Sequence, residues 1–215
     1  YKRTNSFFEN SELASKGLPS GKELKYLSGY MDQLPKEVFK EEFNPPKTDG
    51  SGFMRQELQK ATSLLQKSGW ELVDGKLINK QSGKKFEFEI LLVSPAFERI
   101  VLPFIDNLAK LGINVSLRTI DSAQYQNRLD TFDFDMIVST FSQSLSPGNE
   151  QRDMWSSAAA TTPGSRNHMG IQNPAIDELI EIIVQSKTRE GQKDPIFPLD
   201  RPLFYNKRQT HKRCC

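Results

Sequence analysis

The sequence predicts an α/β fold, in which helices and strands alternate along the chain. The first observation is a succession of strand, helix, strand, helix and strand between residues 85 and 141. The connections between these strands are long enough for the crossovers that parallel strands require. The second observation is a pair of amphipathic helices expected at 53–68 and 173–188. We therefore expect a parallel-rich sheet flanked by helices.

The helix expected at 53–68 follows NPPKTDGSG (44–52), a segment rich in residues that break regular structure. Gly69 is typical of a helix C-terminal stop. The apolar residues of the segment recur at helical spacing and share one face: Met54, Leu58, Ala61, Leu64 and Leu65.

A hairpin is expected directly after this helix. The dipeptide Asp74-Gly75 stands between two alternations of apolar and polar residues, which is a strong hairpin signal. We expect strands near 70–73 and 76–79, and a further strand at 85–93.

The segment that follows continues the alternation. Apolar residues at helical spacing predict a helix at 97–111, closed by Gly112, and Pro103 should kink it or shift its first turn. A strand at 113–120 follows this helix.

Asp121 is suited to cap the next helix, which is expected at 122–132. The apolar run DMIVSTF then predicts a strand at 135–141. In open α/β sheets, ligands bind beyond the carboxyl ends of the strands. The segment after this strand therefore has the position of a binding loop.

The last predicted helix, at 173–188, begins with Asn173 as N-cap and Pro174 in its first position. Residues 1–50 are rich in proline and glycine and are expected to form an irregular segment that wraps over another surface. The α/β core is expected at 51–190. Residues 191–215 are expected to form a basic tail that is disordered or aberrant.

Composition limits the function classes. The net charge of +2 is too small to indicate a nucleic-acid partner, and the sequence has no apolar run of about 18 residues. Its two cysteines are the adjacent Cys214 and Cys215, so the folded body is free of cysteine. Such a body suits an oxidising compartment. The apolar fraction of 36% is low for a self-contained domain and suits one lobe of a larger protein.

The sequence offers no catalytic centre and no metal-ligand spacing. Its two histidines are His168, expected in a loop, and His211, in the basic tail. Asp133 and Asp135 precede the last strand of the alternation and are expected to be turn residues. We expect no enzyme activity, no cofactor and no metal.

The loop FSQSLSPGNEQRDMW (141–155) combines hydrogen-bonding side chains with aromatic residues. One interpretation assigns the aromatic residues to the core and the polar residues to solvent, and the other makes the loop a ligand site. With GSRNHMG (164–170), the ligand-site interpretation gives eight candidates: Phe141, Gln143, Ser144, Asn149, Arg152, Trp155, Arg166 and Asn167.

Several stretches together resemble the carboxyl-terminal part of the extracellular solute-binding proteins of peptide ABC importers, the dipeptide/oligopeptide-binding family 5. The order and spacing of these stretches match across residues 1–190, and SLSPGNEQR is most similar to the branch that takes up oligopeptides and microcin C. The stretches are 3–21, 49–70, 88–113, 124–138, 142–155 and 164–180.

The resemblance implies that the chain is one truncated lobe of a two-lobed protein with a periplasmic-binding-protein type II-like fold. A peptide or peptide-like ligand would be buried between the lobes, and loop 141–155 would reach into the cleft. The implied partners are the missing amino-terminal lobe and an inner-membrane ABC permease, and the protein would be a monomer in the periplasm. The competing hypothesis is a stand-alone α/β enzyme or regulatory domain that uses the same loop.

One position departs from the family pattern. Oligopeptide binders of this family carry an aspartate in the corresponding loop, which pairs with the α-amino group of the ligand. Ser144 stands there in this chain. A neutral hydroxyl group cannot supply that charge pair, so the resemblance does not imply ordinary anchoring of the amino terminus.

Overall fold

The computed structural model describes residues 4–9 and 11–205 and divides them into two compact units. The inserted unit is Pro46–Ser139, and the discontinuous unit combines the residues up to Pro45 with those from Thr140 onward. This division differs from the single α/β core expected at 51–190, because the chain after the last strand packs with Phe8 and Leu13 near the amino terminus.

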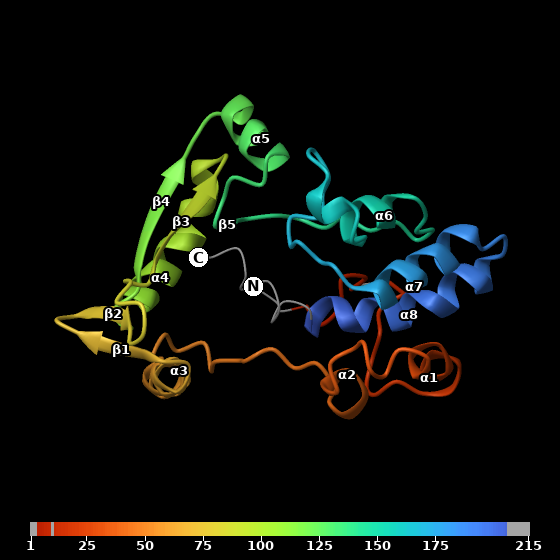
Figure 1. Ribbon diagram of the computed structural model, residues 1–215, viewed down its shortest axis with the longest axis horizontal. Helices are drawn as coiled ribbons and strands as arrows, with labels where there is room; N and C mark the ends of the chain where they lie inside the picture. The colour runs from red at the N-terminus through yellow and green to blue at the C-terminus, as the bar shows by residue number, and fades with distance from the viewer. Residues whose placement is uncertain (1–3, 10, 206–215) are drawn as a thin grey trace. The chain divides into compact units, whose positions relative to one another are not determined.

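The inserted unit begins with α3 (Arg55–Lys67) and the antiparallel hairpin of β1 (Trp70–Val73) and β2 (Lys76–Asn79) (Figure 1). The turn between the strands has positive φ at Asp74 (49°) and Gly75 (76°). Two consecutive positive φ values define the turn type whose twist matches paired strands. The predicted helix and hairpin are confirmed.

Three parallel strands form the sheet of the inserted unit, in the order β4-β3-β5. They are β3 (Glu87–Leu92), β4 (Asn114–Thr119) and β5 (Met136–Ile137). The crossovers contain η1 (Pro95–Phe97), α4 (Glu98–Ala109) and α5 (Ser122–Asp130). The predicted parallel α/β alternation is confirmed, although β5 is shorter than the strand expected at 135–141.

The two faces of this sheet differ in chemistry. Ile90 and Leu92 pack with Val101 of α4 in one apolar cluster. On the alternate residues of β3, Glu89 accepts a hydrogen bond from Arg128 of α5 at 2.8 Å, and Arg128 also pairs with Asp133 at 3.0 Å. The period-two alternation of a strand places these groups on opposite faces. Asp133 is thus a structural partner, as the sequence predicted for a turn residue.

The discontinuous unit is helical. Its elements are α1 (Gly21–Ser28), α2 (Glu37–Lys40), α6 (Glu150–Trp155), η2 (Ala159–Thr161), α7 (Pro174–Gln185) and α8 (Arg189–Tyr205). Asn173 caps α7 by accepting a hydrogen bond from the backbone N–H of Ala175 at 2.9 Å, as predicted. This helix belongs to the discontinuous unit, whereas the sheet belongs to the inserted unit.

The core of the discontinuous unit joins its two chain segments. Helices α7 and α8 pack side by side (Figure 1), and residues near the amino terminus pack with them. The cluster of buried residues consists of Phe8, Leu13, Met154, Trp155, Ile171, Ile176, Leu179, Ile180, Ile183, Ile196, Leu199 and Leu203.

Two predictions about the ends of the chain are corrected by this packing. Residues 1–50 are not wholly irregular, because they include α1 and α2. Residues 191–205 are not a disordered tail, because they lie in α8, whereas 206–215 fall outside the described residues. The buried residues Ile196, Leu199 and Leu203 recur at helical spacing, and their burial offsets the hydrogen bonds lost at three prolines.

The strap, residues 5–9 and 11–17, is held by two adjacent charged residues of α8. Asp200 accepts hydrogen bonds from the backbone N–H of Phe7 at 2.9 Å and from the backbone N–H and hydroxyl group of Ser15 at 3.1 and 2.6 Å. Arg201 donates to the carbonyl groups of Lys16 and Gly17 at 2.9 and 2.6 Å. These bonds connect segments that lie more than 180 residues apart in the sequence.

Both charges are buried. The side chain of Arg201 is 7% exposed and pairs with Glu23, which is 13% exposed. Burial raises the pKa of Asp200 above its ordinary value, and the hydrogen bonds from Ser15, Ser6 and the backbone oppose that shift.

Among the described residues, no helix is both long enough and apolar enough to cross a membrane.

We expect Arg201→Met to destabilise the chain by about 3–5 kcal/mol, because it leaves Glu23 buried without its cation and two strap carbonyl groups without donors. The measurement is the free energy of unfolding in urea. Lys22→Met is the control, since Lys22 forms an ion pair with Asp194 but its side chain is 75% exposed. Equal stability of Arg201→Met and the Lys22→Met control would contradict the structural role of Arg201.

Candidate functional site

The loop that follows the sheet rests on an aromatic cluster in the discontinuous unit. The ring of Phe141 stacks on that of Trp155 with 4.9 Å between centroids, and Phe7 of the strap meets Phe141 edge-on at 5.4 Å. Trp155 is fully buried, whereas Phe141 is half-buried. Of the two aromatic candidates, Phe141 therefore has exposed surface, and Trp155 supports it from the core.

A relay of amide groups, buried at Gln151 and Trp155, connects Trp155 to the loop. The indole N–H of Trp155 donates to Gln151 at 3.0 Å, and the amide N–H of Gln151 donates to Gln143 at 2.7 Å. Gln151 is fully buried and was not among the eight candidates. Its position four residues before Trp155 on one helix is a signal that could have identified it. The relay fixes the side chain of Gln143 at the base of the loop.

Arg152 forms a two-pronged ion pair with Glu181 of α7. Its Nε and Nη2 atoms donate to the two carboxylate oxygens of Glu181, each at 2.6 Å, and its Nη1 donates to Asn149 at 2.5 Å. The hydrogen bond between them raises the pKa of Arg152 and lowers that of Glu181. The side chains are 42% and 44% exposed, so solvent screens the pair.

This geometry is the one with which arginine recognises a carboxylate. Arg152 was one of the eight candidates, and in the structure a carboxylate of the protein itself occupies its guanidinium fork. A ligand carboxylate would have to replace Glu181 at Arg152.

A groove of about 560 Å³ lies between α6 and α7, beside this ion pair. Two further carboxylates line it, and each has a partner. Asp177 accepts from the backbone N–H of Ser157 at 2.7 Å, and Glu178 accepts from the hydroxyl group of Tyr30 at 2.7 Å. Burial and this hydrogen bond raise the pKa of Tyr30 to about 12. The groove therefore carries negative charge, most of it engaged in contacts within the protein.

The two candidates after α6 have structural partners. Arg166 donates to Asp153 at 2.6 Å on the surface. Asn167 is fully buried, donates to the carbonyl groups of Ser156 and Ile171 and accepts from the backbone N–H of Ile171, each at 2.9 Å. In this conformation Asn167 holds the backbone of its loop and offers no surface to a ligand.

The crest of the loop, residues 144–149, carries the exposed part of the site, and Pro147 within it is buried. Ser144 is exposed and accepts a hydrogen bond from the backbone N–H of Ser146 at 3.1 Å. Leu145 is 61% exposed, and Asn149 is exposed beside Arg152. Hydroxyl, amide and apolar groups thus stand together above the aromatic cluster. Such a set can bind a ligand by hydrogen bonds and apolar contact.

A search for metal ligands in the described part of the chain gives no group of three or more histidine, cysteine, aspartate or glutamate side chains suited to hold an ion. The polar groups of the loop are amides, hydroxyl groups and paired charges. Such groups can donate and accept hydrogen bonds.

Comparison with known proteins gives the family, relatives and folds that the chain resembles. Residues 14–163 match the family model of bacterial extracellular solute-binding proteins, family 5 Middle. An uncharacterized protein of Sinorhizobium fredii is 48% identical over 204 residues, which are 95% of this chain and 31% of that protein. A probable peptide-binding protein, YejA of Agrobacterium fabrum, is 42% identical over 206 residues, which are 96% of this chain and 34% of that protein.

A solved structure has a similar fold. The oligopeptide-binding protein AppA of Bacillus subtilis, in complex with a nonapeptide, has a TM-score of 0.59 at 21% identity, with 89% of this chain and 38% of that chain covered. The predicted α/β fold of the periplasmic-binding-protein type II kind is confirmed by this likeness. The chain spans about a third of the length of the curated relatives it matches.

We expect Gln151→Leu to destabilise the chain by about 1–3 kcal/mol, because the change leaves the buried indole N–H of Trp155 and the amide oxygen of Gln143 without partners. Urea unfolding measures the effect. Gln185→Leu, an exposed glutamine on α7, is the matched control. If the two variants lose the same stability, the relay does not support the loop.

Proposed function

Because the chain belongs to the bacterial extracellular solute-binding proteins of family 5, we propose that it is part of the binding component of an ABC importer that captures oligopeptides or peptide-like compounds. The observation that carries the proposal is the match to this family over residues 14–163. The relative named as a probable peptide-binding protein, 42% identical over 96% of the chain, supports the ligand class.

The loop at 141–155 is proposed to contact the ligand, and its geometry divides the eight candidates into two groups. Phe141, Gln143, Ser144, Asn149 and Arg152 have side chains that reach solvent and would face a peptide. The two buried candidates, Trp155 and Asn167, would support the loop from beneath. Arg166 would contribute only after release from Asp153.

Backbone recognition suits this set of side chains. Amide and hydroxyl groups can pair with the N–H and C=O groups of any peptide, so they give affinity with little selection among side chains. The relay through Gln151 holds the amide of Gln143 in one orientation, which lowers the entropy cost of binding. A binding protein for varied peptides needs both backbone pairing with little side-chain selection and binding groups that are already oriented.

Other features of the proposal concern the whole protein. Its ligand would be buried between this lobe and a second lobe, and its partner would be an ABC permease of the inner membrane. The family is extracellular, and we place the protein in the periplasm. The curated relative YejA and the solved neighbour AppA are named for binding, which supports a function without catalysis.

We expect the complete protein to bind peptides in calorimetry and this chain alone to bind them weakly or not at all. Closure of two lobes buries most of such a ligand, and one lobe supplies about half of that surface. The panel should include peptides with free and with acetylated amino termini, since Ser144 supplies no charge at that end. Failure of the complete protein to bind any member would refute the proposed function.

Arg152 and Glu181 give a matched pair of variants in the complete protein. If a ligand carboxylate takes the place of Glu181, Arg152→Ala should weaken peptide binding roughly ten- to hundredfold, and Glu181→Gln should strengthen it by removing the competing carboxylate. Peptides amidated at the carboxyl terminus are the control and should respond to neither change. An affinity within a factor of two of wild type in Arg152→Ala would assign Arg152 to the surface ion pair alone.

A further inference from the structure

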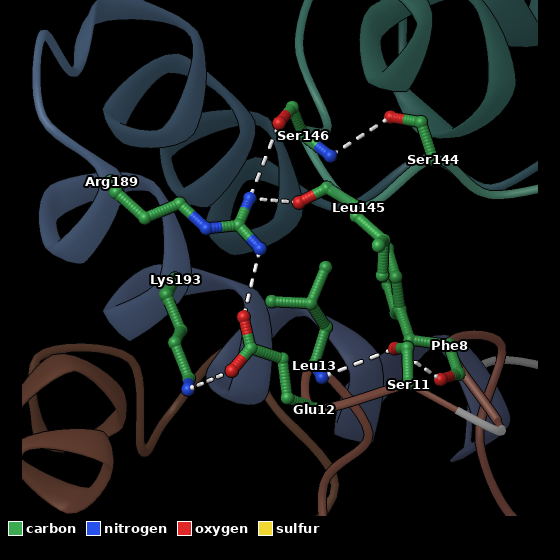
Figure 2. A network of polar contacts seen from close by, with 9 residues as sticks. All are labelled: Phe8, Ser11, Glu12, Leu13, Ser144, Leu145, Ser146, Arg189 and Lys193. Atoms are coloured by element: carbon green, nitrogen blue, oxygen red, sulfur yellow. Dashed lines mark hydrogen bonds and ion pairs between the residues drawn. The ribbon is translucent and has the colours of Figure 1, made fainter.

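The crest of the proposed binding loop is tied to α8 by Arg189 (Figure 2). The Nη1 atom of Arg189 donates to the backbone carbonyl group of Leu145 and, at 3.2 Å, to the hydroxyl group of Ser146. Ser146 in turn donates its backbone N–H to Ser144 at 3.1 Å. The guanidinium group therefore contacts the backbone next to the residue that stands where the family pattern has an aspartate.

The other edge of the same guanidinium group binds the strap. The Nη2 atom of Arg189 donates to Glu12 at 2.8 Å, and Glu12 receives a second cation, the ammonium group of Lys193, at 2.8 Å. Arg189 and Lys193 are four residues apart on α8 and therefore share a helix face. Figure 2 shows the carboxylate of Glu12 between the two side chains.

Arginine is suited to this position and lysine is not. A planar guanidinium group offers donors on two edges at fixed angles, whereas all donors of a lysine ammonium group are on one nitrogen atom. In the structure one edge contacts the loop and the other contacts Glu12. Glu12 thereby orients Arg189. Lys193 pairs with the other carboxylate oxygen of Glu12, and this bond does not reach the loop.

We propose that Arg189 is the positioning residue of the ligand loop: oriented by Glu12, it fixes the backbone at 144–146 and so presents Ser144 and Gln143 to the ligand. The inference rests on the proposed function of the loop. It adds a residue that lies outside the loop and outside the eight candidates. It also gives the strap a part in ligand binding, because the strap supplies Glu12, the carboxylate that pairs with Arg189.

The loop is otherwise supported at its two ends. Gln143 is held by the relay at one end, and at the other the backbone N–H of Gly148 donates to Glu150 at 2.8 Å. The residues between these supports belong to no helix or strand. Loss of Arg189 should therefore loosen this stretch and leave the helices on either side unchanged.

The test compares Arg189→Ala, Arg189→Lys and Lys193→Ala in the complete protein. The first measurement is backbone hydrogen exchange of residues 142–149 without ligand. We expect exchange of the Ser146 amide, whose N–H donates to Ser144 beside the Arg189 contacts, to become at least tenfold faster in Arg189→Ala. Arg189→Lys keeps the positive charge, but its backbone should exchange as fast as that of Arg189→Ala. The exchange rates of Lys193→Ala should resemble those of the wild type. Unchanged exchange in Arg189→Ala, or equal acceleration in Lys193→Ala, would overturn the proposal.

The second measurement is peptide affinity. We expect Arg189→Ala to weaken binding roughly tenfold, with an unfolding midpoint close to that of Lys193→Ala. Faster exchange with unchanged affinity would overturn a role in presenting the ligand groups. If the wild-type protein binds no peptide, the proposed function fails, whereas the exchange comparison still decides whether Arg189 positions the loop.

Discussion

Asp200 and Arg201 connect the first described residues of the chain to the last, and the discontinuous unit depends on this connection. The two side chains have opposite charge and point to complementary backbone groups of the strap: N–H groups for the carboxylate and carbonyl groups for the guanidinium group. A buried charge is tolerated only when it is paired and hydrogen-bonded. The strap supplies these partners, and the charges hold the strap in register. Phe8 and Leu13 then enter the core beside α7 and α8.

The strap connects this clamp to the loop by two routes. Through the core, Phe7 packs against Phe141 and Trp155, from which the amide relay leads to Gln143. Along the surface, Glu12 orients Arg189, which contacts the crest of the loop. The two routes differ in burial. Breaking the relay at Gln151 leaves the buried indole N–H of Trp155 without a partner, whereas Arg189 and Glu12 meet at the surface. The ion pair of Arg152 and Glu181 lies outside 144–146 and is exposed, so it can rearrange around a ligand.

Sequence reasoning was accurate where the determinant is local. Asp121 and Asn173 cap the helices that follow them, and Asp74-Gly75 makes the hairpin turn. Each of these depends on a few adjacent residues. The division into two units was missed, because it depends on contacts between residues almost 200 positions apart. The helix α8 was missed because its three prolines predict the opposite, although Ile196, Leu199 and Leu203 have helical spacing. The partners of Arg152 and Arg166 lie 29 and 13 residues away, and no local pattern indicates them.

The strap has a consequence for the order in which the chain folds as it is synthesised. The inserted unit contains all of its residues once Ser139 has been made, and its parallel strands pair across fewer than 50 residues. Among the described residues the strap is made before the inserted unit, yet its anchors Asp200 and Arg201 are among the last to appear. At ordinary rates of synthesis the remaining stretch takes on the order of several seconds. Throughout that interval Phe8 and Leu13 are apolar residues without a core, and a nascent chain in this state is a substrate for chaperones.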